Sequence, residues 1–211
     1  MGAVYVVRHG QASFGAADYD RLSPAGARQA GLLGDFLKAR GIRPTTVVSG
    51  GLRRQRETAL HLARAAEWSA PPSVDPRWDE FRLGPEDDSL GLSGQTDSQA
   101  YQADLETRMR HWETDGGGSE TLTAFTERVL GALADLAASL GSGEDAVVVT
   151  SAGVISMVVS SLLGAGTEQW ILLNRVCVNS GVTKVVAGRR GLSLLSFNEH
   201  GHLGRADITY R

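Results

Sequence analysis

A short apolar run near the start of the chain stops abruptly at an arginine, a histidine and a glycine. Residues Ala3 to Val7 are β-branched, aromatic or small, which is typical of a buried strand, and Arg8, His9 and Gly10 follow at once. A cation beside an imidazole at the end of a buried strand is costly unless both groups have partners. We therefore expect Arg8 and His9 to form the centre of an anion-binding site.

The same succession of a short apolar run, a turn and a helical segment recurs along the chain. Strands are expected at 45–49 and 146–150, and helices at 24–41, 52–68, 101–112, 122–140 and 154–163. Strands that alternate with helices favour a parallel sheet with helices on both faces. Residues 182–187 and 192–197 flank a Gly-Arg-Arg-Gly turn and predict a hairpin. The pattern predicts an α/β fold, a three-layer α/β/α sandwich with a mostly parallel central sheet.

Composition narrows the class of protein. A chain of 211 residues with 42% hydrophobic residues is long enough for one sizeable core, so we expect a single domain over 1–211, with a loop and helix insertion over the active site at about 84–118. The net charge of −3 gives no reason to expect nucleic acid or an anionic membrane as a partner. The single cysteine, Cys177, excludes an internal disulfide and favours a reducing, cytoplasmic setting.

One uncharged stretch, residues 146–167, is long enough to span a membrane. It contains five serine or threonine residues before its end, with Gly153 in the middle. This composition favours a buried strand, a turn and a buried helix over a membrane span.

Open α/β sheets place their ligands at the carboxyl ends of their strands. Three turns are expected there, Arg8-His9-Gly10, Ser49 to Arg54 and Ser151-Ala152-Gly153, and Asp79-Glu80 comes from a later segment. These turns are far apart in sequence and can meet only in the folded chain.

Several sequence motifs accompany these turns in a fixed order. They are Leu22-Ser23 with Gly26-Ala27-Arg28-Gln29-Ala30, then Ser49 with Leu52-Arg53-Arg54 and Thr58-Ala59, Glu80 with Gly84, Ser119-Glu120-Thr121, and Asn198 with His202-Leu203. In their order and spacing the chain resembles the histidine phosphatase superfamily, which includes the cofactor-dependent phosphoglycerate mutases. The resemblance runs over nearly the whole chain and implies a phosphoglycerate mutase-like fold.

The resemblance also implies a role for each site residue. His9 would attack phosphorus and become a phosphohistidine, and Glu80 would protonate the leaving alcohol and later activate water. The expected phosphate-binding residues are Arg8, Arg54, Ser151, Ala152 and Gln11. The expected ligand is a small phosphorylated molecule or a phosphate ion. No cofactor or metal is expected, because the histidines are scattered without ligand spacing. Homo-oligomers are common in such proteins, but the sequence specifies no interface.

One departure from the family pattern lies after the third expected strand. The family has Ser/Thr-His-Gly-Gly there, whereas this chain has Thr150-Ser151-Ala152-Gly153, so the second family histidine is replaced by Ser151. Loss of one preorganised donor costs roughly 10²–10³ in rate at comparable sites. The sequence therefore predicts a phosphomonoester phosphatase with low activity, in which Ser151→His raises turnover if the missing donor limits the rate.

Three alternatives stand beside this prediction. A non-catalytic phospholigand-binding protein would follow if the missing histidine abolished turnover. A phosphoglycerate mutase-type phosphotransferase fits less well, because Gly15 stands where mutases have asparagine and Leu83 where they have tyrosine. A serine hydrolase centred on Ser151 is disfavoured, because Val149 stands where the elbow motif requires its first glycine.

Overall fold

Six strands form one sheet in the order β3-β2-β4-β1-β5-β6. The computed structural model of the chain describes residues 2–13, 16, 18–83, 98–115 and 120–210. The strands are β1 (Gly2–Arg8), β2 (Thr46–Ser49), β3 (Ser73–Val74), β4 (Asp145–Thr150), β5 (Val182–Gly188) and β6 (Gly191–Glu199). β3, β2, β4 and β1 are parallel, whereas β5 is antiparallel to both β1 and β6. The mostly parallel sheet expected from the sequence is confirmed.

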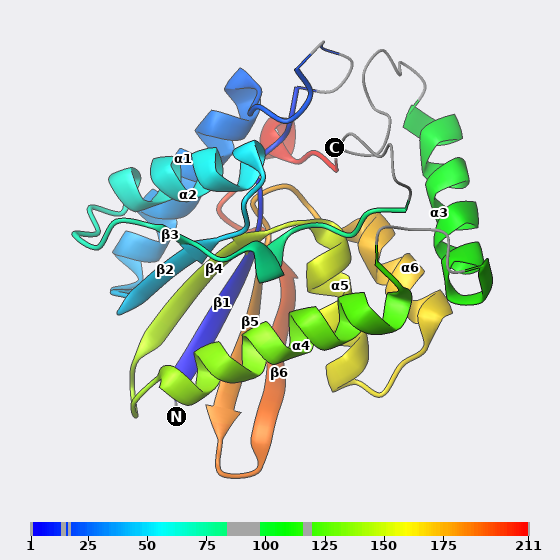
Figure 1. Cartoon of the computed structure of the whole chain (residues 1–211). Coiled ribbons are helices and arrows are strands. Elements are labelled where there is room, and N and C mark those ends of the chain that lie inside the picture. The colour runs from blue at the N-terminus through cyan, green and yellow to red at the C-terminus, as the bar shows by residue number, and fades with distance from the viewer. Residues whose placement is uncertain (1, 14–15, 17, 84–97, 116–119, 211) are drawn as a thin grey trace.

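Helices cover both faces of the sheet (Figure 1). The helices are α1 (Pro24–Ala39), α2 (Arg53–Ala65), α3 (Ser98–Asp115), α4 (Leu122–Ser139), α5 (Ala152–Leu162) and α6 (Thr167–Val176), with short 3-10 turns η1 (Pro76–Trp78) and η2 (Arg205–Asp207). Side chains alternate across a strand, so successive residues of β1 enter different cores. Tyr5 and Val7 pack with Leu33 of α1 and Leu62 of α2. Val4 and Val6 belong to the core on the side of α4 and α5, which gives the three layers.

Local sequence explains where α1 begins. Ser23 caps it by accepting a hydrogen bond from the Gly26 amide, and Pro24 occupies the first helical position. Position 26 also requires glycine, because a Cβ there would lie 2.1 Å from the Gln11 carbonyl oxygen. The turn after β1 therefore rests directly on the first turn of α1.

The structure differs from the sequence prediction mainly in two elements. The sequence did not predict α6, in which only Trp170 and Ile171 are buried while Leu172 and Val176 are exposed. The two-residue strand β3 was also missed, because it is too short to show a period. The predicted hairpin is present as β5 and β6, joined at Arg189 and Arg190.

The segment 146–167 forms most of β4, all of α5 and the loop to α6. No helix in the described ranges is long and apolar enough to cross a membrane. Of the insertion expected at 84–118, only the stretch that forms α3 lies in the described part; residues 84–97 and 116–118 lie outside it. α3 packs against α6, where Arg175 donates two hydrogen bonds of 2.8 and 2.6 Å to the Glu106 carboxylate.

Candidate active site

The first two site residues leave the end of β1 on opposite sides of the sheet. Arg8 lies on the side of α5 and donates from Nη1 to the Cys177 carbonyl oxygen. Its Nε is buried and, within the described residues, has no hydrogen-bond partner. Burial lowers the pKa of this guanidinium below its ordinary value. A buried N–H donor without an acceptor is costly, so this group suits an incoming anion.

His9 lies on the side of α2 and is 4% exposed. Its Nδ1 is 2.8 Å from the Gly10 carbonyl oxygen, and its Nε2 is 3.1 Å from Nε of Arg54. The carbonyl can only accept and the guanidinium can only donate, so the neutral imidazole carries its proton on Nδ1 and its lone pair on Nε2. Burial, with the charges of Arg54 and Arg8, lowers the pKa of His9 well below its ordinary value. Nε2 is thereby kept unprotonated, as a nucleophile requires.

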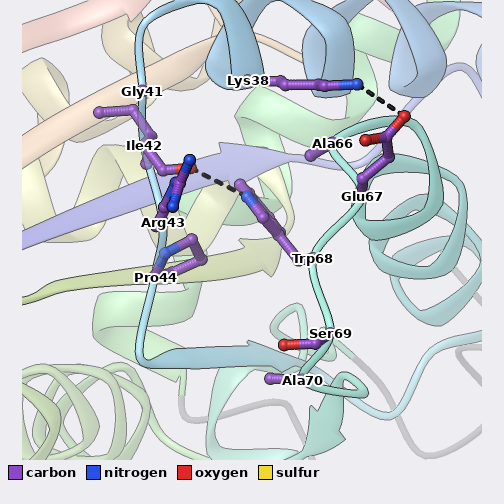
Figure 2. Close-up of a pocket in the computed structure, with 10 residues that line it drawn as sticks. All are labelled: Lys38, Gly41, Ile42, Arg43, Pro44, Ala66, Glu67, Trp68, Ser69 and Ala70. Atoms are coloured by element: carbon purple, nitrogen blue, oxygen red, sulfur yellow. Dashed lines mark hydrogen bonds and ion pairs between the residues drawn. The ribbon is translucent and has the colours of Figure 1, made fainter.

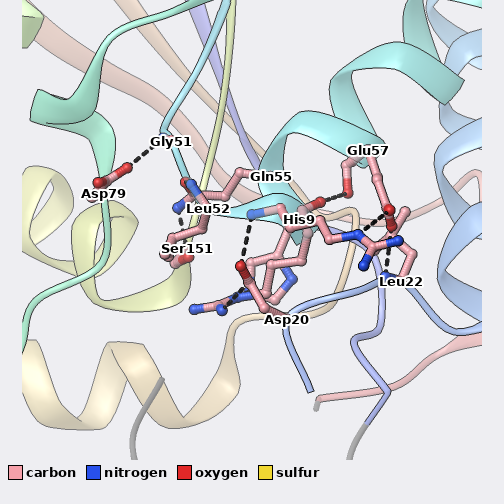
Figure 3. Close-up of polar contacts among 12 residues, drawn as sticks. His9, Asp20, Leu22, Gly51, Leu52, Gln55, Glu57, Asp79 and Ser151 are labelled. Carbon is pink, nitrogen blue, oxygen red and sulfur yellow. Dashed lines mark hydrogen bonds and ion pairs between the residues drawn. The ribbon is translucent and has the colours of Figure 1, made fainter. Parts of the chain in front are cut away.

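Arg54 stands in the first turn of α2 and is 2% exposed. Besides donating to His9, it donates from Nη1 to Asp20 at 2.6 Å and lies over the Tyr19 ring, 5.4 Å from its centroid. Asp20 also accepts a hydrogen bond of 2.8 Å from the Arg53 amide (Figure 3). The loop after β1 therefore fixes the guanidinium over the imidazole.

Glu80 reaches the same edge of the sheet from the segment after η1. Its carboxylate accepts hydrogen bonds of 3.2 Å from the amides of Gly153 and Phe81. Burial raises the pKa of Glu80 above its ordinary value, against the lowering effect of the Gly153 amide and Arg54. A raised carboxyl pKa is what proton donation near neutral pH requires.

An aromatic cluster holds the residue next to Glu80. The Phe81 ring lies 5.5 Å from Trp112, 5.7 Å from Phe125 and 5.5 Å from Trp170, measured between centroids. The Trp170 indole in turn donates a hydrogen bond of 2.9 Å to the Gly153 carbonyl oxygen. Glu80 is thus attached to a well-packed core rather than to a free loop.

The remaining predicted residues occupy different positions. Ser151 and Ala152 are buried at the start of α5, where Ser151 accepts a hydrogen bond of 2.9 Å from Gln55. The side-chain oxygen of Gln11 accepts from Ser23 at 2.9 Å, so this side chain is tied to the N-terminus of α1. The fold brings Arg8, His9, Arg54, Glu80 and Ser151 to one edge of the sheet, whereas Gln11 supports the turn beside them.

Two site neighbours were not found from the sequence. Gln55 belongs to a run of charged residues that looks like a solvated helix face, yet it is completely buried. Residues 55, 58, 59 and 62 are all buried and follow helical spacing, so this period was the signal that could have found it. Asp20 has no such signal, because its contacts depend on the path of an irregular loop.

A separate cavity of about 320 Å³ lies between the carboxyl ends of α1 and α2, at the opposite edge of the sheet (Figure 2). Four of its lining residues contact one another in pairs: Lys38 pairs with Glu67 at 2.6 Å, and the Trp68 indole donates to the Ile42 carbonyl oxygen at 2.9 Å. In the described ranges, no group of three or more histidine, cysteine, aspartate or glutamate residues could hold a metal ion.

Comparisons with known proteins identify the family to which this chain belongs. The sequence model of the histidine phosphatase superfamily (branch 1) matches residues 4–200. The chain belongs to this superfamily, as the order of its motifs predicted. Among curated protein sequences, none matches this chain.

Solved structures share the fold. Phosphoserine phosphatase from Entamoeba histolytica, in complex with 3-phosphoglyceric acid, is 20% identical, with a TM-score of 0.72 over 97% of this chain and 100% of its own. A mycobacterial glucosyl-3-phosphoglycerate phosphatase in complex with VO3 is 24% identical, with a TM-score of 0.69 over 93% and 98%. A putative alpha-ribazole-5'-P phosphatase from Escherichia coli is 20% identical, with a TM-score of 0.69 over 94% and 96%. The phosphoglycerate mutase-like fold predicted from the sequence is confirmed.

Proposed function

We propose that this chain is a phosphomonoester phosphatase that acts through a phosphohistidine on Nε2 of His9. The observation that carries the proposal is the tautomer and orientation of the His9 imidazole. Its proton is held on Nδ1 by the Gly10 carbonyl and its Nε2 lone pair faces the Arg54 guanidinium. A neutral, oriented nitrogen beside a fixed cation is suited to attack a phosphate ester.

The reaction has two steps. In the first, the Nε2 lone pair forms a bond to phosphorus, the ester P–O bond breaks, and Glu80 gives its proton to the departing alkoxide. In the second, Glu80 takes a proton from water, the water oxygen bonds to phosphorus, the P–N bond breaks, and phosphate leaves. Arg8 and Arg54 neutralise the equatorial oxygens in both steps, which is the main catalytic requirement of phosphoryl transfer.

The relatives support a small phosphorylated substrate. Structures of this fold have been solved with phosphoserine, 3-phosphoglyceric acid and inorganic phosphate. Replacement of the family histidine by Ser151 removes one expected donor from the site. This replacement favours slow turnover, and in its extreme form it favours a second candidate function, the binding of a phosphorylated ligand without hydrolysis.

Covalent trapping distinguishes the two functions. The protein is mixed with nitrophenyl phosphate, quenched in alkali, in which phosphohistidine survives, and the phosphorylated residue is identified by mass spectrometry. We expect phosphate on His9 in the unmodified protein and in His61→Ala, an exposed residue of α2, and none in His9→Ala. Phosphate binding without any covalent label or released nitrophenol would refute hydrolysis and leave the binding function.

A further inference from the structure

A buried hydrogen-bonded pair stands beside the candidate nucleophile. Gln55 and Ser151 are 0% and 1% exposed, and the Gln55 amide nitrogen donates to the Ser151 hydroxyl at 2.9 Å. The same nitrogen lies 3.3 Å from the Trp78 carbonyl oxygen, and Oε1 of Gln55 accepts from the Leu52 amide at 3.2 Å. These contacts to main-chain groups fix which end of the Gln55 amide faces Ser151.

Within the part of the chain that the structure describes, the hydroxyl proton of Ser151 has no acceptor. Ser151 is the N-cap residue of α5, but its side chain makes no capping hydrogen bond. Because an amide N–H can only donate, the contact with Gln55 uses a lone pair of the Ser151 oxygen and not its proton. Among the described residues this hydroxyl donates to nothing, so its O–H bond remains for a ligand.

The geometry of the sheet places this hydroxyl on the same side as the nucleophile. Arg8 pairs with Thr150 across β1 and β4, so His9 and Ser151 follow side by side, and the His9 amide donates to the Thr150 carbonyl oxygen at 2.8 Å. The first turn of α2 contacts both residues: Arg54 donates to His9, and Gln55 donates to Ser151 (Figure 3). Two consecutive residues of one helix therefore orient two side chains at the same strand ends.

We propose that Gln55 is a positioning residue that turns the Ser151 hydroxyl so that its proton is donated to an oxygen of the transferred phosphoryl group. The pair takes the place of the histidine that the family pattern has at position 151. This inference rests on the proposed phosphatase function. A lone serine hydroxyl rotates among several directions, whereas an amide that occupies one lone pair restricts the direction of the O–H bond.

A double-mutant cycle tests whether the effect of Gln55 on kcat depends on the Ser151 hydroxyl. With nitrophenyl phosphate, Ser151→Ala is expected to lower kcat by about 10²-fold, the loss typical of one removed donor. Gln55→Leu is expected to lower kcat by about tenfold, because the hydroxyl remains but loses its orientation. In the double variant we expect no loss beyond that of Ser151→Ala, because Gln55 acts only through the hydroxyl. KM should change much less than kcat, since the donor acts mainly on the transition state.

A second variant gives a readout that a purely structural role would not move. In Gln55→Glu the carboxylate still accepts from the Leu52 amide, but its other oxygen can only accept and so captures the Ser151 proton. We expect kcat to be lowered at pH 7.5 and to recover as the introduced carboxyl is protonated at lower pH, a recovery absent from the unmodified protein. This variant also serves if Gln55→Leu does not fold.

The control is Ser160→Ala, a buried serine of the same helix whose hydroxyl donates to the Met157 carbonyl oxygen at 3.2 Å. Its kcat should match that of the unmodified protein. Full activity in Ser151→Ala, or an equal loss from Gln55→Leu with and without Ser151, would overturn the inference. Absence of phosphohistidine in the unmodified protein would instead refute the proposed function.

Discussion

The close approach of α5 to the candidate acid makes Gly153→Ala a sharp test of the site. A Cβ added at Gly153 would lie 2.3 Å from Cε1 of Phe81 and 2.4 Å from Oε1 of Glu80. Both distances are too short for real atoms, so the Phe81 ring and the Glu80 carboxylate must both move away from position 153. The Phe81 ring is packed among three other aromatic rings, so its movement strains the core, whereas the Glu80 carboxylate is expected to shift further.

The size of the displacement follows from these distances. Restoring an ordinary contact of 3.4 Å requires Oε1 to move by about 1 Å, and a misplacement of this size in a catalytic group costs about 10² in rate. The same substitution is expected to cost about 1–3 kcal/mol of folding free energy through overpacking. The loss of activity should therefore exceed the loss of folded protein at room temperature.

The assay compares substrates that differ in their need for a proton. kcat/KM is measured for alkyl phosphates, whose leaving group must be protonated, and for nitrophenyl phosphate, whose leaving group departs as an anion. We expect Gly153→Ala to lower kcat/KM by about 10² for alkyl phosphates and by much less for nitrophenyl phosphate. An equal loss for both substrates would refute the role of Glu80 as the acid, and no loss for either would refute the steric reasoning.

The matched control is Gly131→Ala in the exposed part of α4, where an added Cβ meets no atom within 4 Å. Its activity should be unchanged. Its unfolding free energy should rise by about 0.5–1 kcal/mol, because alanine loses less conformational entropy than glycine in a helix. A kinetic effect in this variant would show that alanine substitution disturbs the enzyme without regard to place.

Three further predictions concern the Arg54 cation, the pH dependence of stability, and the return of the family histidine at position 151. Arg54→Lys should lower kcat/KM of nitrophenyl phosphate by about 10²–10³, because one ammonium group cannot hold both the imidazole and the Asp20 carboxylate; unchanged kinetics would contradict this role. Burial lowers the pKa of His202 to about 4 in the folded protein. As pH drops from 6.5 toward 4, this imidazole is therefore protonated in the unfolded chain before it is protonated in the folded one, and the free energy of unfolding falls. Urea midpoints over this range should fall less for His202→Gln than for the unmodified protein, and parallel curves would refute the assignment. Ser151→His should lower kcat unless it is combined with Gln55→Ala, because Gln55 fills the space beside the hydroxyl; a rise from the single substitution would contradict the packing argument and agree with the expectation from sequence.

Much of the fold could be predicted because its signals are local. Short apolar runs and helical spacing identified β1, β2, β4, the hairpin and five of the six described helices. The missed helix, α6, has buried Trp170 and Ile171 next to exposed Leu172, so its apolar residues do not mark a single face. Its position depends on packing against α3 and α5, which no local pattern records.

In the candidate site too, some features follow from the sequence and others only from the tertiary structure. The sequence by itself determined the family, the order of its motifs and the residue types at His9, Arg54, Glu80 and Ser151, because all of these follow from the order of residues along the chain. Only the tertiary structure decided what these side chains contact. The proton on Nδ1 of His9, the carboxylate of Asp20 on Arg54 and the amide of Gln55 on Ser151 all depend on hydrogen bonds that form when the chain folds. Gln55 and Ser151 are 96 positions apart in sequence, and they meet because parallel β2 and β4 end at one edge of the sheet while α2 begins above it.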